Sequence, residues 1–218
     1  VGHPLLDKKN ISKIDISNLI SDDKRIISIF PGSRISELNV LLPILIDFVK
    51  LMNEKYENMI FVFHTNKIHK NLIFEEIKQS NLTNVVVISD AIIKNQVLSR
   101  SIFAVSKSGT VSLEICNNGV PSIIIYKLSP LNFFIIKSLV KVKFVNIINI
   151  INDKEVIPEL LQSECNAKEI FTSVNYFLKK PEMISEQLNQ IKKTINEIKS
   201  ETPSAENAAR ILSENFVS

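Results

Sequence analysis

The chain has 218 residues, 45% of them hydrophobic and 22% charged, with a formal net charge of +3. This composition excludes a disordered chain, and the length suffices for one large α/β domain. The positive charge is too small to indicate nucleic-acid binding, and aromatic and basic residues are not interleaved as they are in single-strand binders. We therefore expect a folded domain that binds no nucleic acid.

The start of the chain indicates a piece of a longer protein. The first residue is Val1 rather than methionine, and residues 1–24 are polar and broken, which predicts a linker with at most one short helix. They lack the charged and apolar regions of a signal peptide. We interpret residues 1–24 as the remnant of a preceding N-terminal portion. Cys116 and Cys165 lack metal-site spacing and are expected as reduced thiols of a cytoplasmic protein.

Apolar runs alternate with helical periodicity between residues 25 and 126. The first run, IISIF, is apolar throughout, as in a parallel strand that is covered on both faces. Ser36 is the expected N-cap of the first helix, in which Pro43 introduces a kink or a restart. The alternation predicts a Rossmann-like α/β fold, a parallel sheet with helices on both faces. We expect strands at 25–30, 59–63, 84–88, 102–106 and 121–126, and helices at 36–52, 66–80, 94–100 and 111–118.

The pattern changes after residue 126. We expect a helix at 129–139, a strand or irregular apolar segment at 144–151, a short helix at 158–162, and helices at 167–178, 181–199 and 203–216. We therefore divide the chain into the linker remnant 1–24, a Rossmann-like ligand-binding domain 25–165 and a C-terminal helical extension 166–218.

Two of the four glycines lie at corresponding points of the predicted fold. Gly32 and Gly109 each follow a strand, precede a helix and stand beside a serine. Both loops therefore lie at the carboxyl edge of the sheet, where open α/β folds bind ligands. Helix N-termini at that edge attract phosphate groups.

The first loop carries groups suited to an anion. Gly32 lets the backbone approach closely, Ser33 adds a hydroxyl donor, and the fork of Arg34 matches phosphate oxygens. The alternative is an ordinary turn with a solvated arginine.

The second loop places hydroxyls and a carboxylate at a helix start. Ser108 and Thr110 flank Gly109, and Glu114 falls near the first turn, where its carboxylate can accept hydrogen bonds from ribose hydroxyls. The alternative is a Ser/Thr cap with a glutamate favoured by the helix dipole. Neither a GxGxxG nor a GK[ST] motif is present.

Other candidate sites carry less information. His64 ends the second strand and faces either the ligand edge or the packed interior. His3, His64 and His69 lack metal-ligand spacing, so we expect no metal. No Ser-His-Asp set or G-x-S-x-G nucleophile motif is visible. Residues 131–143 combine aromatics with lysines, which suits an anionic membrane surface, although a core helix with a basic edge is the alternative.

Taken together and in order, a set of short segments resembles the lipid-A-disaccharide synthase family. They are residues 1–7, 31–34 with Glu37, 108–110 with Leu113 and Glu114, Pro121 with 126–127, 139–141 with 144–145, Asn149, and 158–162.

The resemblance implies a GT-B glycosyltransferase with two Rossmann-like domains across a cleft. The family transfers 2,3-diacylglucosamine from its UDP-linked donor to the acceptor 2,3-diacylglucosamine 1-phosphate, releases UDP and uses no cofactor. It acts in the cytoplasm, peripherally at the inner face of the inner membrane. This chain resembles the donor-binding half. The acceptor contacts and the general base are expected on a missing N-terminal domain or partner chain, so the chain alone is expected to be inactive.

The resemblance also assigns residue roles. Arg34 is expected to stabilise the leaving group. The donor-binding set is Gly32, Ser33, Arg34, Glu37, Ser108, Gly109, Thr110, Glu114, Tyr126, Asn149, Glu159 and Gln162. The chain departs from the family pattern at Lys107, where a small residue is usual, at Ile148, where proline is usual, and at 152–153, where a small pair is usual.

Two other functions remain open from the sequence. The first is a non-catalytic nucleotide-sugar-binding subunit of a split glycosyltransferase. The second is another GT-B enzyme that uses a UDP-sugar, such as a UDP-N-acetylglucosamine epimerase, against which the motifs between 139 and 162 argue.

Overall fold

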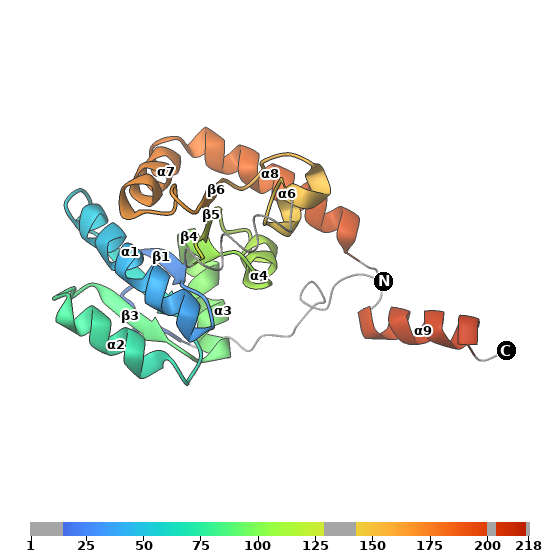
Figure 1. Cartoon of the computed structure of the whole chain (residues 1–218), viewed down its shortest axis with the longest axis horizontal. Helices are drawn as coiled ribbons and strands as arrows, with labels where there is room; N and C mark the ends of the chain where they lie inside the picture. The colour runs from blue at the N-terminus through green and yellow to red at the C-terminus, as the bar shows by residue number, and fades with distance from the viewer. Residues whose placement is uncertain (1–14, 129–142, 200–203, 217–218) are drawn as a thin grey trace.

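The core of the fold is one sheet of six parallel strands. The computed structural model describes residues 15–128, 143–199 and 204–216. The strands lie in the order β3-β2-β1-β4-β5-β6, the doubly wound arrangement in which the strand order reverses between β1 and β4 (Figure 1). They are β1 (Arg25–Phe30), β2 (Met59–His64), β3 (Val85–Ile88), β4 (Ser101–Lys107), β5 (Ser122–Tyr126) and β6 (Glu159–Leu161).

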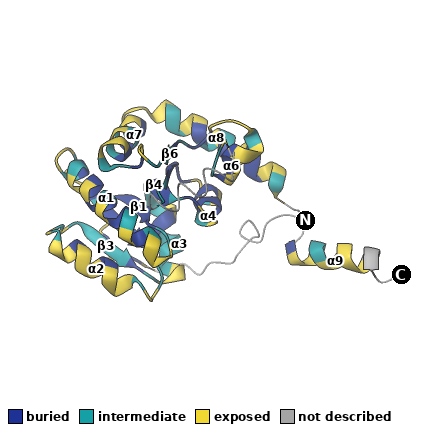
Figure 2. Ribbon diagram, viewed as in Figure 1, coloured by how far each residue is buried: buried dark blue, intermediate teal, exposed yellow. Residues whose placement is uncertain are grey.

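Helices cover both faces of this sheet. Side chains alternate along β1, so that Ile27 and Ile29 join a core with α1, α2 and α7, while Ile26 packs against α3 on the other face. Figure 2 shows the buried strands between partly exposed helices. The helices are α1 (Ile35–Asn53), α2 (Lys70–Gln79), α3 (Ala91–Arg100), α4 (Val111–Asn117), α6 (Ile147–Asn152), α7 (Ala167–Lys179), α8 (Pro181–Ile198) and α9 (Ser204–Phe216). The predicted α/β fold is confirmed.

The first helix begins earlier than expected and runs without a restart. Arg34, with extended backbone angles, is its N-cap, so the prediction of Ser36 as N-cap was wrong. The helix continues through Pro43 to Asn53. Buried leucines stand on both sides of the proline, among them Leu42 and Leu45, and their packing offsets the lost backbone hydrogen bond.

Two segments after β5 differ from the expected elements. The stretch 144–151, predicted as a strand or irregular, contains helix α6, whose N-cap Asn146 accepts a hydrogen bond from the Ile148 N–H (2.9 Å). The stretch 158–162, predicted as a helix, contains strand β6. Pairing with the open edge of β5 decides its structure, because the N–H of Ile124 donates to the Pro158 carbonyl (2.8 Å). The predicted helix at 129–139 lies outside the described residues.

Helices α7 and α8 share the core of the sheet. Ile170 and Val174 of α7 pack in the main cluster, and Ile191 and Ile195 of α8 pack against α4 and β5. Figure 1 shows α9 apart from the sheet. The proposed division at residue 165 stays a prediction, and α7 and α8, which follow that residue, share the core of the sheet. Among the described residues, no helix is both long and apolar enough to cross a membrane.

Candidate functional site

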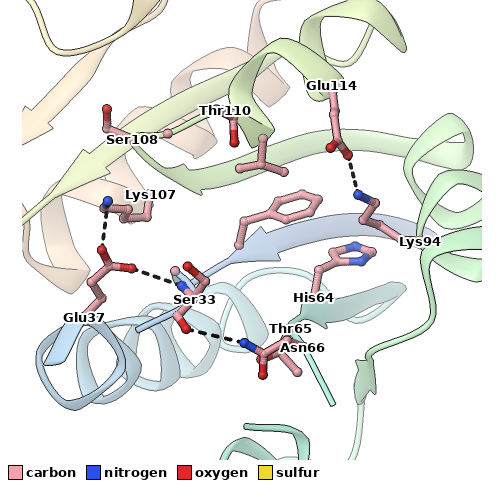
Figure 3. A pocket seen from close by; sticks show the side chains of 14 residues that line it. Ser33, Glu37, His64, Thr65, Asn66, Lys94, Lys107, Ser108, Thr110 and Glu114 are labelled. Carbon is pink, nitrogen blue, oxygen red and sulfur yellow. Dashed lines mark hydrogen bonds and ion pairs between the residues drawn. The ribbon is translucent and has the colours of Figure 1, made fainter. Parts of the chain in front are cut away.

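A cavity of about 320 Å³ opens at the carboxyl ends of β1 and β4, where the strand order reverses (Figure 3). This is the place at which doubly wound sheets bind ligands. Both predicted loops contribute to its lining. The predicted site residues that line it are Gly32, Ser33, Glu37, Ser108, Gly109, Thr110 and Glu114.

The first loop is folded around the carboxylate of Glu37. That carboxylate accepts hydrogen bonds from the N–H groups of Ser33 (3.0 Å) and Arg34 (3.4 Å). Gly32 has φ +107°, and a Cβ placed there would clash with Glu37 Oε2 and lie 3.0 Å from the Glu37 Cβ. Gly32 therefore makes room for a side chain of its own loop, in a backbone conformation that favours glycine.

Arg34 lies outside the cavity lining in this structure. Its side chain is 78% exposed, and its Nη1 lies 3.5 Å from Glu37 Oε1. A surface arginine of this kind is free to change rotamer at little cost. Its expected contact with a leaving group stays a prediction.

Lys107, a departure from the family pattern, lines the cavity between the two loops. Its Nζ lies 3.0 Å from Glu37 Oε1, so the last residue of β4 is ion-paired with the first turn of α1. The same Nζ lies 5.3 Å from the ring centroid of Tyr126, which itself does not line the cavity. Burial raises the pKa of Glu37, but hydrogen bonds from Lys107 and from the Ser33 N–H outweigh it and hold this pKa below its usual range.

The hydroxyls of Ser108 and Ser112, in the second loop and the helix that follows it, are used within the protein. The Ser108 hydroxyl donates to the Val145 carbonyl (2.8 Å), which ties the loop to the segment before α6. The Ser112 hydroxyl donates to the Gly109 carbonyl (2.7 Å). Thr110 is the N-cap residue of α4 but makes no side-chain cap hydrogen bond. The hydroxyl of Thr110 therefore stays available at the cavity wall.

Glu114 forms an ion pair with Lys94 on the opposite wall (Figure 3). Glu114 lies in the first turn of α4, and Lys94 comes from α3. The two lysines of the lining thus face the two glutamates, which leaves the cavity close to neutral. Neither lysine was among the predicted site residues. Only the position of Lys107 beside Ser108 could have pointed to it.

His64 lies in the cavity floor and is buried. Its ring stacks on Phe30 with 4.4 Å between centroids. The Ser101 hydroxyl donates to the Val97 carbonyl, so the Ser28 hydroxyl donates to Ser101 and accepts from His64 Nε2–H at 2.9 Å. Nδ1 of His64 has no partner among the described residues. Burial, reinforced by the charge of Lys94, lowers the pKa of His64 to about 3, so the ring is neutral.

This histidine makes stability depend on pH. The pKa of His64 in the folded chain, about 3, lies below the ordinary 6.5, so the unfolded chain binds the proton first and stability falls as pH drops below 6.5. Between pH 7 and pH 5 this group should cost about 2 kcal/mol of unfolding free energy. Urea unfolding of the wild type and of His64→Gln at both pH values measures the difference. An unchanged profile in His64→Gln would contradict the assignment.

The predicted residues Asn149 and Glu159 form a buried network behind the second loop. Asn149 Nδ2 donates to Glu159 Oε1 (2.8 Å) and to the Ile157 carbonyl (2.7 Å), and its Oδ1 accepts from the Val156 and Ile157 N–H groups. Glu159 accepts from the Val145 N–H at 2.8 Å. Because Val145 also accepts the Ser108 hydroxyl, the network supports the loop without lining the cavity.

The remaining sequence candidates lie elsewhere. Gln162 has φ 50° at the end of β6, and its N–H donates to the Tyr126 carbonyl (2.8 Å). Residues 131–142 of the suggested membrane segment lie outside the described residues. Within the described part of the chain, no group of His, Cys, Asp and Glu side chains could hold a metal ion. Cys116 and Cys165 are free and buried, and burial raises their thiol pKa values to about 12 and about 11.

Solved structures share this fold. A putative UDP-N-acetylglucosamine 2-epimerase from Listeria monocytogenes matches with a TM-score of 0.60 and 16% identity, over 100% of this chain and 49% of that one. The S. aureus MnaA–UDP structure matches with a TM-score of 0.63 and 13% identity, over 98% of this chain and 53% of that one. At such low identity these likenesses concern the fold alone.

Sequence relatives are more specific. The lipid-A-disaccharide synthase of Sulfurihydrogenibium sp. (strain YO3AOP1) is 37% identical over 82% of this chain and 49% of its own length. That of Rickettsia prowazekii (strain Madrid E) is 29% identical over 100% of this chain and 58% of its own length. The chain thus spans about half the length of the curated relatives it matches. The family model described as lipid-A-disaccharide synthetase matches residues 1–214, and the chain therefore belongs to that family.

Proposed function

We propose that this chain is the donor-binding half of a lipid-A-disaccharide synthase. Its cavity would hold the UDP of UDP-2,3-diacylglucosamine, whose sugar is transferred to 2,3-diacylglucosamine 1-phosphate. The observation that supports this most is the position of the cavity, between the Gly32 and Gly109 loops at the reversal of the sheet, in a chain of this family.

The proposed reaction is a direct displacement at the anomeric carbon with UDP as leaving group. The negative charge that develops on the diphosphate needs donors fixed in place before the reaction. Ser33 and Thr110 offer hydroxyls from the two loops that line the cavity, and Arg34, the residue after Ser33, offers an exposed guanidinium. Glu114 would accept hydrogen bonds from the ribose hydroxyls, with Lys94 holding its carboxylate in place.

Transfer also requires groups from outside this chain. The general base and the acceptor contacts would come from the N-terminal portion of the protein, either as a domain of the same chain or as a partner chain. Both substrates carry acyl chains, so the assembled enzyme would work in the cytoplasm, peripherally at the inner membrane.

Binding of UDP tests the proposal directly. Arg34→Ala should weaken UDP binding by about 1.5–3 kcal/mol, because a charged hydrogen bond to the diphosphate is lost. Calorimetric titration of UDP into the wild type and the variant measures the loss. Arg25→Ala is the matched control, since this exposed arginine begins β1 at the amino ends of the strands, whereas the cavity lies at their carboxyl ends.

The outcomes separate the proposals. A wild-type chain that does not bind UDP would overturn the donor-binding function. Unchanged UDP affinity in Arg34→Ala would remove the role assigned to that arginine only. Preference for UDP-N-acetylglucosamine over UDP-2,3-diacylglucosamine would point instead to another UDP-sugar enzyme.

A further inference from the structure

Lys107 brings a cation with restricted freedom to the first loop. The residue ends β4 directly before Ser108, and its side chain is 19% exposed although it lines the cavity. The contacts of its Nζ with Glu37 (3.0 Å) and with the Tyr126 ring (5.3 Å) hold the ammonium in one place. A cation held in this way loses little side-chain entropy when a ligand binds.

The Glu37 carboxylate gathers the donors that an anionic ligand of this loop would also need. It accepts the Ser33 and Arg34 N–H groups and the Lys107 ammonium. Convergent backbone N–H groups with a cation beside them are the surroundings in which proteins bind phosphate oxygens. The donors around Glu37 therefore already point toward a negative charge.

We propose that Lys107 is a direct ligand of the diphosphate of the nucleotide sugar. This inference rests on the proposed function and adds a second cation to Arg34. A lysine ammonium has three N–H donors, so it can donate to a phosphate oxygen while it keeps Glu37 as a partner. The contact would put a full positive charge at the leaving group, which the small residue usual at this position in the family cannot supply.

The other cations of the region are less suited to this role. Among the described residues, Lys94 and Lys107 are the lysines that line the cavity, and Lys94 is engaged with Glu114 on the far wall. Arg34 is 78% exposed and lies outside the lining. Lys107 alone of these three combines low exposure with contact to the carboxylate of the first loop.

Titrations with three probes test the proposal on the 218-residue chain. UDP and inorganic pyrophosphate should bind to Lys107→Met about tenfold more weakly or worse than to the wild type, whereas uridine should change less than about twofold. Lys107→Arg should keep the affinity for UDP within about threefold, because it keeps the charge. The matched control is Lys50→Met, which breaks the exposed ion pair between Lys50 and Asp47 on α1. It should leave the affinities for all three probes unchanged.

Repeating the titration in a Glu37→Gln variant separates direct contact of Lys107 with the diphosphate from mere neutralisation of the Glu37 charge. Lys107→Met leaves Glu37 without its lysine, and the bare carboxylate alone would repel UDP. In a Glu37→Gln chain that repulsion is absent, so a direct ligand should still lose about fivefold or more in UDP affinity when Lys107 becomes methionine. A loss that disappears in this background, or an equal loss for UDP and uridine, would overturn the proposal.

The probes also distinguish failure of this inference from failure of the proposed function. A wild type that binds pyrophosphate in a Lys107-dependent way but does not bind UDP would overturn the nucleotide-sugar function and retain the anion site. Equal UDP affinities of the wild type and of Lys107→Met would overturn the role of Lys107 and leave the proposed function standing. Binding of neither UDP nor pyrophosphate would overturn both.

Discussion

Replacing Gly32 with alanine should lower the free energy of unfolding by about 2–5 kcal/mol. The backbone there has φ +107°, a strained conformation for alanine that costs about 1–3 kcal/mol. The new Cβ would also clash with Glu37 Oε2, which must then release the Ser33 N–H it caps, at a further cost of about 0.5–2 kcal/mol. Urea unfolding measures the sum, and the melting temperature should fall by about 5–15 °C.

Gly109 provides the matched control for Gly32. It occupies the corresponding position in the second loop, but a Cβ placed there would meet no atom within 4 Å. Gly109→Ala should therefore change the unfolding free energy by less than about 0.5 kcal/mol. The clash with Glu37 Oε2 should disappear in a Gly32→Ala/Glu37→Ala double variant, which keeps the backbone strain and the 3.0 Å contact with the Cβ of residue 37. Equal costs at the two glycines would contradict this account of the first loop.

Local patterns of apolar residues were enough to predict most of the fold. The apolar run of β1 and its alternation with helical segments were enough to predict a parallel sheet covered on both faces. The element at 159–161 was missed because its structure depends on a partner. The Pro158 carbonyl accepts from the Ile124 N–H and the Gln162 N–H donates to the Tyr126 carbonyl, both at 2.8 Å. The sequence around residue 159 does not indicate that this segment pairs with the edge of β5.

The candidate site was predictable in part for a related reason. Glycine is scarce in this chain, so Gly32 and Gly109 marked the two loops that meet at the cavity. The lysines could not be found in the same way, because the pairing of Lys107 with Glu37 joins residues of separate elements. Gly32 was expected to admit a ligand, whereas in the structure it first admits the carboxylate of Glu37.

The network behind the second loop leads to the other large expected effect. Asn149→Ala should lower the unfolding free energy by about 3–5 kcal/mol, because Asn149 is fully buried and its side chain makes four hydrogen bonds. Its removal would take the partner from the N–H groups of Val156 and Ile157 and from the Ile157 carbonyl, away from water, while Glu159 Oε1 would keep the Asn146 N–H (2.9 Å). Each unsatisfied buried group costs about 1–3 kcal/mol, partly relieved when water enters. Urea unfolding of the variant measures the sum.

Asn149→Ala should also loosen the second loop, which lines the cavity. Glu159 holds the N–H of Val145, whose carbonyl accepts the Ser108 hydroxyl, so a displaced Glu159 loosens the second loop. Asn149→Ala should therefore lower the protection of the amides around Ser108 against hydrogen exchange more than that of the β1 amides. Asn189→Ala, at an exposed position of α8, is the control and should leave both stability and exchange unchanged. If Asn149→Ala were as mild as Asn189→Ala, Asn149 would not hold this part of the fold, and its assigned role behind the loop would have to be withdrawn.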